Sequence, residues 1–276
     1  MQDLDVLKIS CGQNTDTLIY FSYPWAGNAG NTQYRLQRIA NELGCDIIAA
    51  HAPGTGALRT PREIRSALHS NSYELLRKLS IIHVNELSHV LSKENKVYVR
   101  RIGWGDSGRS WLIATMALNS DLFTHVLTRD GAILNRVSIA RGALTLLRNG
   151  GKRFDSPSDM PSENIRKQQG IGRRAYEVAA AVAEMGTYRD IMCTTDVTAQ
   201  SLRDLAAKSS IPFCNVMFGH GISGSAREVQ AFNAEILALR GNGDSFHGLY
   251  EPQLGHGNLQ DWRIAMRHLQ AVLVIK

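Results

Sequence analysis

Short apolar runs alternate with helical patterns along most of the chain, and this alternation constrains the fold more than any other feature of the sequence. Strands and helices that alternate through short connections form a parallel sheet with helices on both faces. The sequence therefore predicts an α/β fold with a mainly parallel sheet. Runs typical of buried strands cover residues 17–23, 46–50, 96–102, 123–128, 211–218 and 246–250, and helical spacing covers residues 32–43, 72–91, 110–118, 227–239 and 259–274.

The alternation breaks between the fourth and fifth predicted strands. Residues 135–210 contain helical patterns and a polar stretch rich in Gly, Ser and Pro, but no strand-like run. We interpret residues 135–210 as a helical cap inserted into a core that residues 1–134 and 211–276 form together. A chain of this length buries enough apolar surface to fold without metal or disulfide support.

Four loops that follow predicted strands carry residues suited to binding or chemistry. They are PWAGNAG at residues 24–30, HAPGTG at residues 51–56, GWGDSG at residues 103–108 and GHGN at residues 255–258. Doubly wound sheets bind ligands beyond the carboxyl ends of their strands. Because all four loops would lie at that one edge, the sequence predicts a single site.

The order and spacing of these loops resemble the α/β-hydrolase superfamily. The matching segments are LIYFSYPWAGNAG, DIIAAHAPGTGAL, IGWGDSG and QLGHGNLQDW, and the resemblance covers most of residues 15–276. The inserted cap falls where that superfamily usually carries one. The first two loops also resemble thioesterases of biosynthetic clusters, which have an aromatic-Pro-x-Ala-Gly segment followed by a Pro-Gly turn. The resemblance implies an α/β-hydrolase fold with helices on both faces of the sheet.

The resemblance also implies a nucleophile on a strained strand-to-helix turn, with small residues on either side of it. The GWGDSG loop allows three registers for this turn. With Gly105 at the apex, the flanking positions are small but no nucleophile exists. With Ser107 at the apex, a bulky arginine stands where a small residue is expected, and with Asp106 at the apex, Trp104 crowds the turn. Sterics and the length of the preceding strand favour the first register, and all three stay open.

A histidine and a carboxylate would complete such a site. His256 follows the last predicted strand between two glycines, so the resemblance implies that it is the base, although it could simply cap the next helix. No carboxylate follows residues 211–218 before Glu228. The resembled family commonly places its acid after that strand, and some of its members place it after the preceding strand instead, so the resemblance implies Asp130 as the candidate acid. The alternatives are that Asp130 pairs with Arg129 or caps the predicted cap domain.

Backbone N–H groups would stabilise the oxyanion in a site of this kind. The turn that contains Gly105 would supply one donor. The loop after the first predicted strand would supply another, because Trp25 and Ala26 follow Pro24 there among glycines. An ordinary glycine-rich loop explains the same segment equally well.

Three functions are consistent with these residues. The first is hydrolysis of a small ester, thioester or amide, in which Ser107 or Asp106 attacks, His256 is the base and Asp130 orients it. The second is a degenerate pseudo-hydrolase that binds a ligand or partner, with Gly105 in place of the nucleophile. The third is a lyase or cyclase without a covalent step, in which His256 and Asp106 move protons.

Composition narrows the partners. The net charge is +6, but no run of Lys and Arg exceeds two residues, so we expect a small-molecule ligand, with a bias toward anions, and no nucleic acid. We expect no membrane span, since no apolar stretch is long enough. The first ten residues lack the apolar core of a signal peptide, and the four cysteines are isolated. We therefore expect a cytoplasmic protein with reduced thiols, and a homo-oligomer stays open.

The sequence also predicts that the protein holds no cofactor and no metal. No Walker loop occurs, and Gly54 and Gly56 lack the third glycine of a dinucleotide fingerprint. No cluster of His, Cys and Asp has the spacing of metal ligands.

Overall fold

The computed structural model describes residues 6–22, 29–50, 81, 84–85, 87–93, 96–131, 188–220, 226–241 and 243–275. In this part of the chain, seven strands form one sheet in the order β1-β3-β2-β4-β5-β6-β7. They are β1 (Val6–Ile9), β2 (Thr17–Ser22), β3 (Asp46–Ala50), β4 (Arg100–Asp106), β5 (His125–Arg129), β6 (Phe213–His220) and β7 (Phe246–Gly255). β1 pairs antiparallel with β3, and the other pairings are parallel. The predicted α/β class is confirmed.

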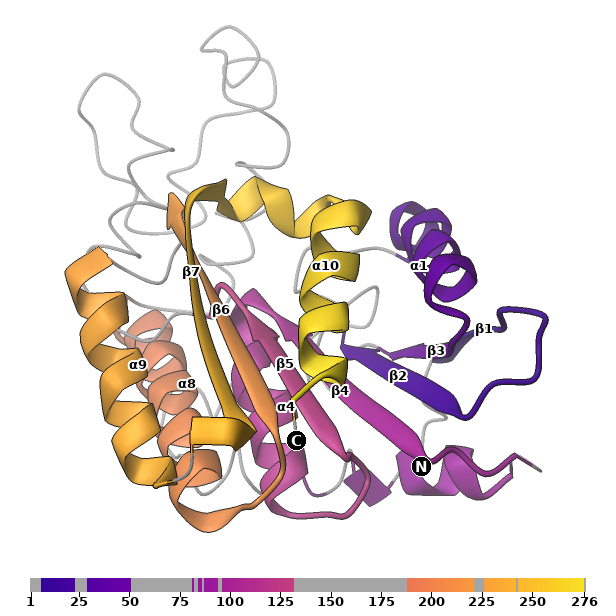
Figure 1. Cartoon of the computed structure of the whole chain (residues 1–276), viewed down its shortest axis with the longest axis horizontal. Coiled ribbons are helices and arrows are strands. Elements are labelled where there is room, and N and C mark those ends of the chain that lie inside the picture. The colour runs from indigo at the N-terminus through magenta and orange to yellow at the C-terminus, as the bar shows by residue number, and fades with distance from the viewer. Residues whose placement is uncertain are drawn as a thin grey trace, which may run out of the picture.

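Helices cover both faces of the sheet (Figure 1). The labelled helices are α1 (Ala29–Leu43), α4 (Ser110–Leu118), α8 (Tyr188–Lys208), α9 (Ala226–Arg240) and α10 (Trp262–Leu273). α1 contacts α10 on one face, whereas α8 contacts both α4 and α9 on the other. This arrangement produces the three layers of a doubly wound domain.

Strand β2 shows why the sequence needs helices on both sides. Every residue from Thr17 to Ser22 is buried. Side chains alternate between the two faces of a strand. Leu18 and Tyr20 accordingly join the hydrophobic cluster under α4, α8 and α9, while Ile19 and Phe21 join the cluster under α1 and α10. The continuous apolar run is thus typical of a central parallel strand.

Strand β4 departs most from the sequence prediction. We expected a strand at residues 96–102 and a turn at once, but β4 starts at Arg100 and runs on through both glycines to Asp106. A Cβ atom on Gly103 would lie 2.8 Å from the Phe123 ring, and one on Gly105 would lie 2.6 Å from the carbonyl oxygen of Arg109. These glycines therefore allow close packing around the strand and do not form a turn.

The predicted cap is described only at its carboxyl end. That end is α8, in which Ala199, Leu202 and Leu205 are buried in the cluster shared with α4 and α9. These contacts put the carboxyl half of α8 in the helical layer that also contains α4 and α9. Residues 135–187 lie outside the described residues, and their assignment as a cap stays a prediction.

Two other features complete the fold. The sequence analysis did not predict β1, a short edge strand in which only Ile9 is buried. Among the described helices, none combines the length and the apolar character that a membrane crossing requires.

Candidate functional site

The turn after β4 contains a strained residue. β4 ends at Asp106, and a short 3₁₀ helix, η1 (Ser107–Arg109), leads directly into α4. Ser107 has φ 56°, in the left-handed region that non-glycine residues seldom occupy. Within the described ranges, Asp130, at φ 47°, is the one other non-glycine residue with a positive φ. The strained position of this strand-to-helix turn is therefore Ser107.

The backbone does not match the register that the sequence analysis favoured. Gly105 lies inside β4, where it pairs with Ser22 of β2 and Thr128 of β5. It stands two residues before Ser107, at a position where the carbonyl of Arg109 leaves no room for a Cβ atom. The prediction of Gly105 at the apex failed because β4 is longer than the apolar run that suggested it.

The residue two positions after Ser107 is not small. Arg109 is only 2% exposed, and its burial lowers the pKa of the guanidinium to about 9. The requirement for a small residue is thus met before the turn, by Gly105, but not after it. The sequence analysis judged Arg109 too bulky for this position, but in the structure its side chain is buried in the interior.

Asp106 does not match the third register either. Its backbone is extended, at φ −101° and ψ 140°. Its carboxylate is fully buried and accepts hydrogen bonds from Arg129 Nε at 2.8 Å and Arg129 Nη2 at 2.7 Å. The indole Nε1 of Trp104 donates a third hydrogen bond at 2.6 Å. A carboxylate that already accepts three hydrogen bonds is poorly suited to attack a substrate.

Asp130 lies beside the turn, at the end of the next strand. Asp106 pairs with Arg129 across β4 and β5, so Ser107 and Asp130 occupy the following positions on the two neighbouring strands. Asp130 is fully buried, and its backbone N–H donates to the carbonyl of Val216 on β6 at 2.7 Å. The neighbouring Arg129 makes an ion pair with Asp106.

His256 lies at the same edge of the sheet. It begins the 3₁₀ helix η4 (His256–Gln260) directly after β7, whose last residue, Gly255, pairs with His220 at the end of β6. η4 then leads into α10, which contacts β5 and β6 (Figure 1). The imidazole of His256 lies outside the described atoms, as do the oxyanion candidates Trp25 and Ala26. The backbones of Ser107, Asp130 and His256 nevertheless follow three parallel strands at one edge.

The sequence analysis did not predict a cluster of two buried arginines, Arg129 and Arg35, near this edge. The Arg129 Nη2 group donates to the Leu259 carbonyl at 2.9 Å, and the Arg35 Nη1 group donates to the same oxygen at 2.7 Å. Both guanidinium groups also approach the Trp104 ring, with Cζ at 4.9 Å and 5.4 Å from its centroid. An arginine inside a buried strand, as in LTRD at the end of β5, is the one signal that could have indicated such a cluster.

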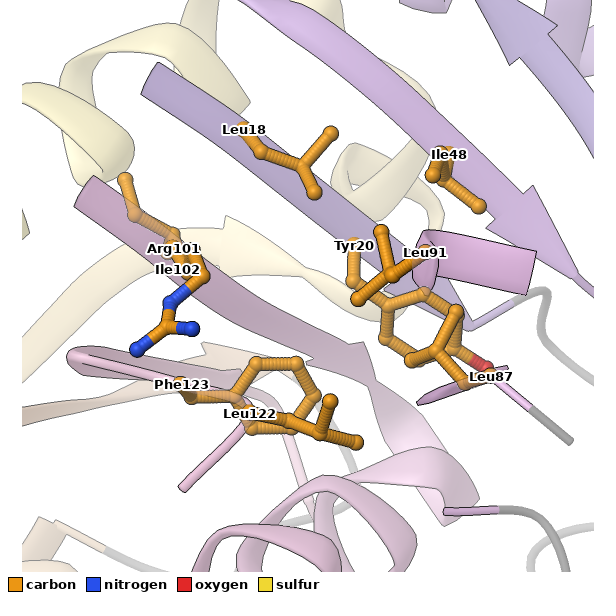
Figure 2. A pocket seen from close by; sticks show the side chains of 9 residues that line it. All are labelled: Leu18, Tyr20, Ile48, Leu87, Leu91, Arg101, Ile102, Leu122 and Phe123. Atoms are coloured by element: carbon orange, nitrogen blue, oxygen red, sulfur yellow. The ribbon is translucent and has the colours of Figure 1, made fainter. Parts of the chain in front are cut away.

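A separate apolar pocket lies at the opposite end of β4. Figure 2 shows the nine side chains that line it, from β2, β3, the helical residues 87–91, the start of β4 and the segment before β5. Arg101 is its one charged residue, and no lining residue is a serine, a histidine or a carboxylate. Since Arg101 is near the start of β4 and Ser107 follows its end, this pocket is distinct from the candidate site.

The described residues offer no other obvious centre for chemistry. No group of three or more His, Cys, Asp or Glu side chains among them could hold a metal ion. Three described cysteines are free thiols, and burial raises the pKa of Cys45 and of Cys214 to about 12. Such thiols stay protonated at neutral pH and are poor nucleophiles.

Comparison with known proteins places this geometry in a familiar architecture. No family model matches the chain, and no curated protein sequence matches it significantly. Solved structures match nearly all of it. N-formylmaleamic acid deformylase from Pseudomonas putida S16 has 12% sequence identity and a TM-score of 0.57, over 99% of this chain and 97% of its own. Est1E from Butyrivibrio proteoclasticus, solved with ferulic acid, has 14% identity and a TM-score of 0.57, over 98% and 94%.

A third match is an esterase from Exiguobacterium antarcticum, with 12% identity and a TM-score of 0.58, over 99% of this chain and 96% of its own. These neighbours share one architecture. The chain has the α/β-hydrolase fold. At this level of sequence identity the likeness concerns the fold alone. In this chain, the strand-to-helix turn between β4 and α4 holds Ser107.

Proposed function

We propose that this α/β-hydrolase-fold protein is a serine hydrolase of small esters, thioesters or amides. In this proposal Ser107 is the nucleophile, His256 is the general base and Asp130 orients the histidine. The observation that carries the proposal is the left-handed backbone of Ser107 at the turn between β4 and α4.

A serine in this conformation needs an explanation. A non-glycine residue held in the left-handed region costs roughly 1–3 kcal/mol, and such strain concentrates at active sites. The turn directs the residue at its apex beyond the end of the sheet, where a substrate can reach it. Gly105 supports the same turn, because only glycine leaves space for the Arg109 carbonyl that packs against it.

The positions of the other two candidates agree with this assignment. Asp130 follows the strand next to β4, and His256 follows β7, so the chain order is nucleophile, acid, histidine. That is the order expected in this fold. The burial of Asp130 suits a carboxylate that stabilises the imidazolium formed when the histidine takes a proton.

The proposed reaction has two steps. Ser107 Oγ attacks the carbonyl carbon of the substrate while its proton passes to His256; the bond to the leaving group then breaks, and the leaving group takes that proton. Water next attacks the acyl-serine, gives a proton to His256, and releases the acid as Oγ is reprotonated. The N–H of Gly108, with one from Trp25 or Ala26, would stabilise the oxyanion.

The two alternative functions have less support. The pseudo-hydrolase interpretation rested on Gly105 at the apex, but this glycine is inside β4. The lyase or cyclase interpretation needs Asp106 to exchange protons, but its carboxylate is held in a buried ion pair with Arg129. Serine hydrolysis requires neither of these residues to leave its observed position.

Labelling with a fluorophosphonate probe tests the proposal directly. The wild-type protein should react at Ser107 and should turn over at least one member of a panel of neutral and anionic p-nitrophenyl esters and acyl thioesters. Ser107→Ala should abolish labelling and lower kcat by at least about a thousandfold. Ser92→Ala is the control, because its hydroxyl is exposed and donates to the nearby His89 carbonyl, and it should behave like wild type. Unchanged turnover in Ser107→Ala would reject the serine mechanism.

A further inference from the structure

A buried hydrogen-bonded link joins the three segments that carry the proposed catalytic residues. Asp106 immediately precedes Ser107, Arg129 immediately precedes Asp130, and Leu259 lies three residues after His256. The Arg129 guanidinium donates to both carboxylate oxygens of Asp106 and also to the carbonyl oxygen of Leu259. One side chain therefore connects the end of β4, the end of β5 and the helix η4.

The link is sealed from solvent. The side chains of Arg129 and Asp106 are 0% and 1% exposed. A buried ion pair often adds no net stability compared with apolar residues of similar size, because removing both charges from water is costly. Net stabilisation of the fold is therefore a weak explanation for the Arg129–Asp106 pair. Its effect on the relative position of the segments that it connects is a stronger explanation.

The chemistry of arginine suits this connection. A planar guanidinium can present two parallel N–H donors to a carboxylate and still direct another toward a carbonyl. A lysine ammonium has no such fixed fork. The replacement of Arg129 by lysine would therefore keep the charge but could not hold Asp106 and Leu259 in the same relative position.

Neighbouring groups hold the link from other directions. Trp104 Nε1 donates to Asp106 Oδ1 at 2.6 Å, and its ring lies within 6 Å of both guanidinium carbons, those of Arg129 and Arg35. Arg35, from α1, donates to the same Leu259 carbonyl at 2.7 Å. The Leu259 carbonyl, in η4, thus accepts hydrogen bonds from Arg35 of α1 and from Arg129 of β5.

We infer that Arg129 is a positioning residue, which fixes η4, and with it His256, relative to the turn at Ser107 and to Asp130. The inference rests on the proposed serine mechanism for its catalytic consequence. Arg129 does not touch the substrate in this account. It acts through Asp106 and the Leu259 carbonyl, so its loss should disturb geometry that the nucleophile and base require.

Replacement of Arg129 should therefore slow chemistry more than it weakens binding. A misplacement of about 1 Å in a catalytic group can cost about a hundredfold in rate. We expect Arg129→Met to lower kcat and the rate of fluorophosphonate labelling by about 10- to 100-fold, with KM changed by less than about threefold. Arg129→Lys should fall between Arg129→Met and wild type.

The matched control is the second bidentate arginine–carboxylate pair of the described residues. Arg203 donates to Glu235 at 2.6 Å and 3.0 Å, but this pair joins α8 to α9 and is about 40% exposed on both sides. Arg203→Met should leave kcat, KM and the labelling rate within about twofold of wild type, because an exposed pair contributes little.

A double variant distinguishes the loss of positioning by Arg129 from the destabilisation caused by an unpaired buried carboxylate. Arg129→Met alone leaves the Asp106 carboxylate buried without its partner, which destabilises the fold. Combining it with Asp106→Asn removes both charges and should restore much of the lost stability, measured by urea unfolding. A purely structural role would restore kcat in parallel, whereas a positioning role leaves kcat as low as in Arg129→Met.

Hydrogen exchange gives a readout that does not depend on activity. The amides of residues 256–261 should exchange at least about tenfold faster in the folded double variant than in wild type, while those of α9 stay unchanged. Unchanged exchange at residues 256–261, or wild-type kcat in the double variant, would overturn the inference. A wild-type protein that neither labels nor hydrolyses any substrate would instead reject the proposed function, and the exchange result would still decide whether Arg129 positions η4.

Discussion

At the scale of single residues, Ser107 and Asp130 share one unusual property. Both have a positive φ, and both occupy the first position after neighbouring parallel strands. Aspartate tolerates the left-handed region better than most residues do, whereas serine gains less from it. The strain at Ser107 should therefore be measurable as a cost to folding that the site tolerates for its function.

Replacing Ser107 by glycine should reveal this cost. Glycine adopts positive φ without a Cβ penalty, so Ser107→Gly should raise the free energy of unfolding by about 1 kcal/mol relative to Ser107→Ala. Urea unfolding of the two variants measures the difference. Ser92→Gly and Ser92→Ala provide the reference pair, and there the glycine variant should be the less stable of the two. Equal stabilities for the two Ser107 variants would mean that the turn is not strained.

At the scale of elements, β4 and α4 work as one unit. α4 is buried along Ser110–Ala117, as expected for a helix that is apolar on all sides. Ile113 of α4 packs against both Gly103 and Gly105, and together with Phe123 and the Arg109 carbonyl it leaves neither glycine space for a side chain. The predicted bounds of α4 were correct, because its apolar pattern is continuous. The bounds of β4 were not, because packing glycines and turn glycines are indistinguishable in a single sequence.

Gly105→Ala tests this packing. The new Cβ atom would lie 2.6 Å from the Arg109 carbonyl oxygen, a backbone atom that cannot rotate away. We expect the free energy of unfolding to fall by about 1–3 kcal/mol, as in other overpacked cores. Gly243→Ala is the control, because its nearest neighbour, Leu237 Cδ1, would be at an ordinary 3.7 Å. A stable Gly105→Ala variant would indicate that the turn after β4 can move.

At the scale of the whole molecule, alternation of strands and helices was enough to predict the sheet, its mainly parallel order and the edge that carries the candidate site. The contacts between side chains at that edge could not be predicted. Asp106 meets Arg129 only because β4 and β5 are neighbours in register, and Leu259 joins them from more than a hundred residues away. Such contacts depend on the finished fold and leave no local pattern in the sequence.

The packing of α10 should make global stability depend on pH. His268 is 1% exposed; burial, with the charges of Arg129 and Arg267, lowers its pKa from 6.5 to about 3, and its Nε2 lies 3.3 Å from Glu251. Between pH 3 and 6.5, the unfolded chain binds a proton at His268 that the folded chain does not. The free energy of unfolding therefore keeps its full value above pH 6.5 and decreases as the pH falls toward 3.

Urea unfolding between pH 3 and 8 measures this dependence. His268→Gln should flatten the part of the curve between pH 3 and 6.5, whereas His89→Gln, on an exposed helical residue, should keep the wild-type shape. Parallel curves for wild type and His268→Gln would show that His268 is protonated as readily in the folded state as in the unfolded chain.

The shared acceptor at Leu259 also has a consequence for how the protein is made. Arg35, Arg129 and Leu259 leave the ribosome in that order, and the carbonyl that receives both guanidinium groups belongs to the last part of the chain. While synthesis is in progress, the early segments would have to hold two cations in the interior with one of their oxygen partners not yet made. The site should therefore be among the last parts of the molecule to become ordered, after the final strand and η4 have emerged.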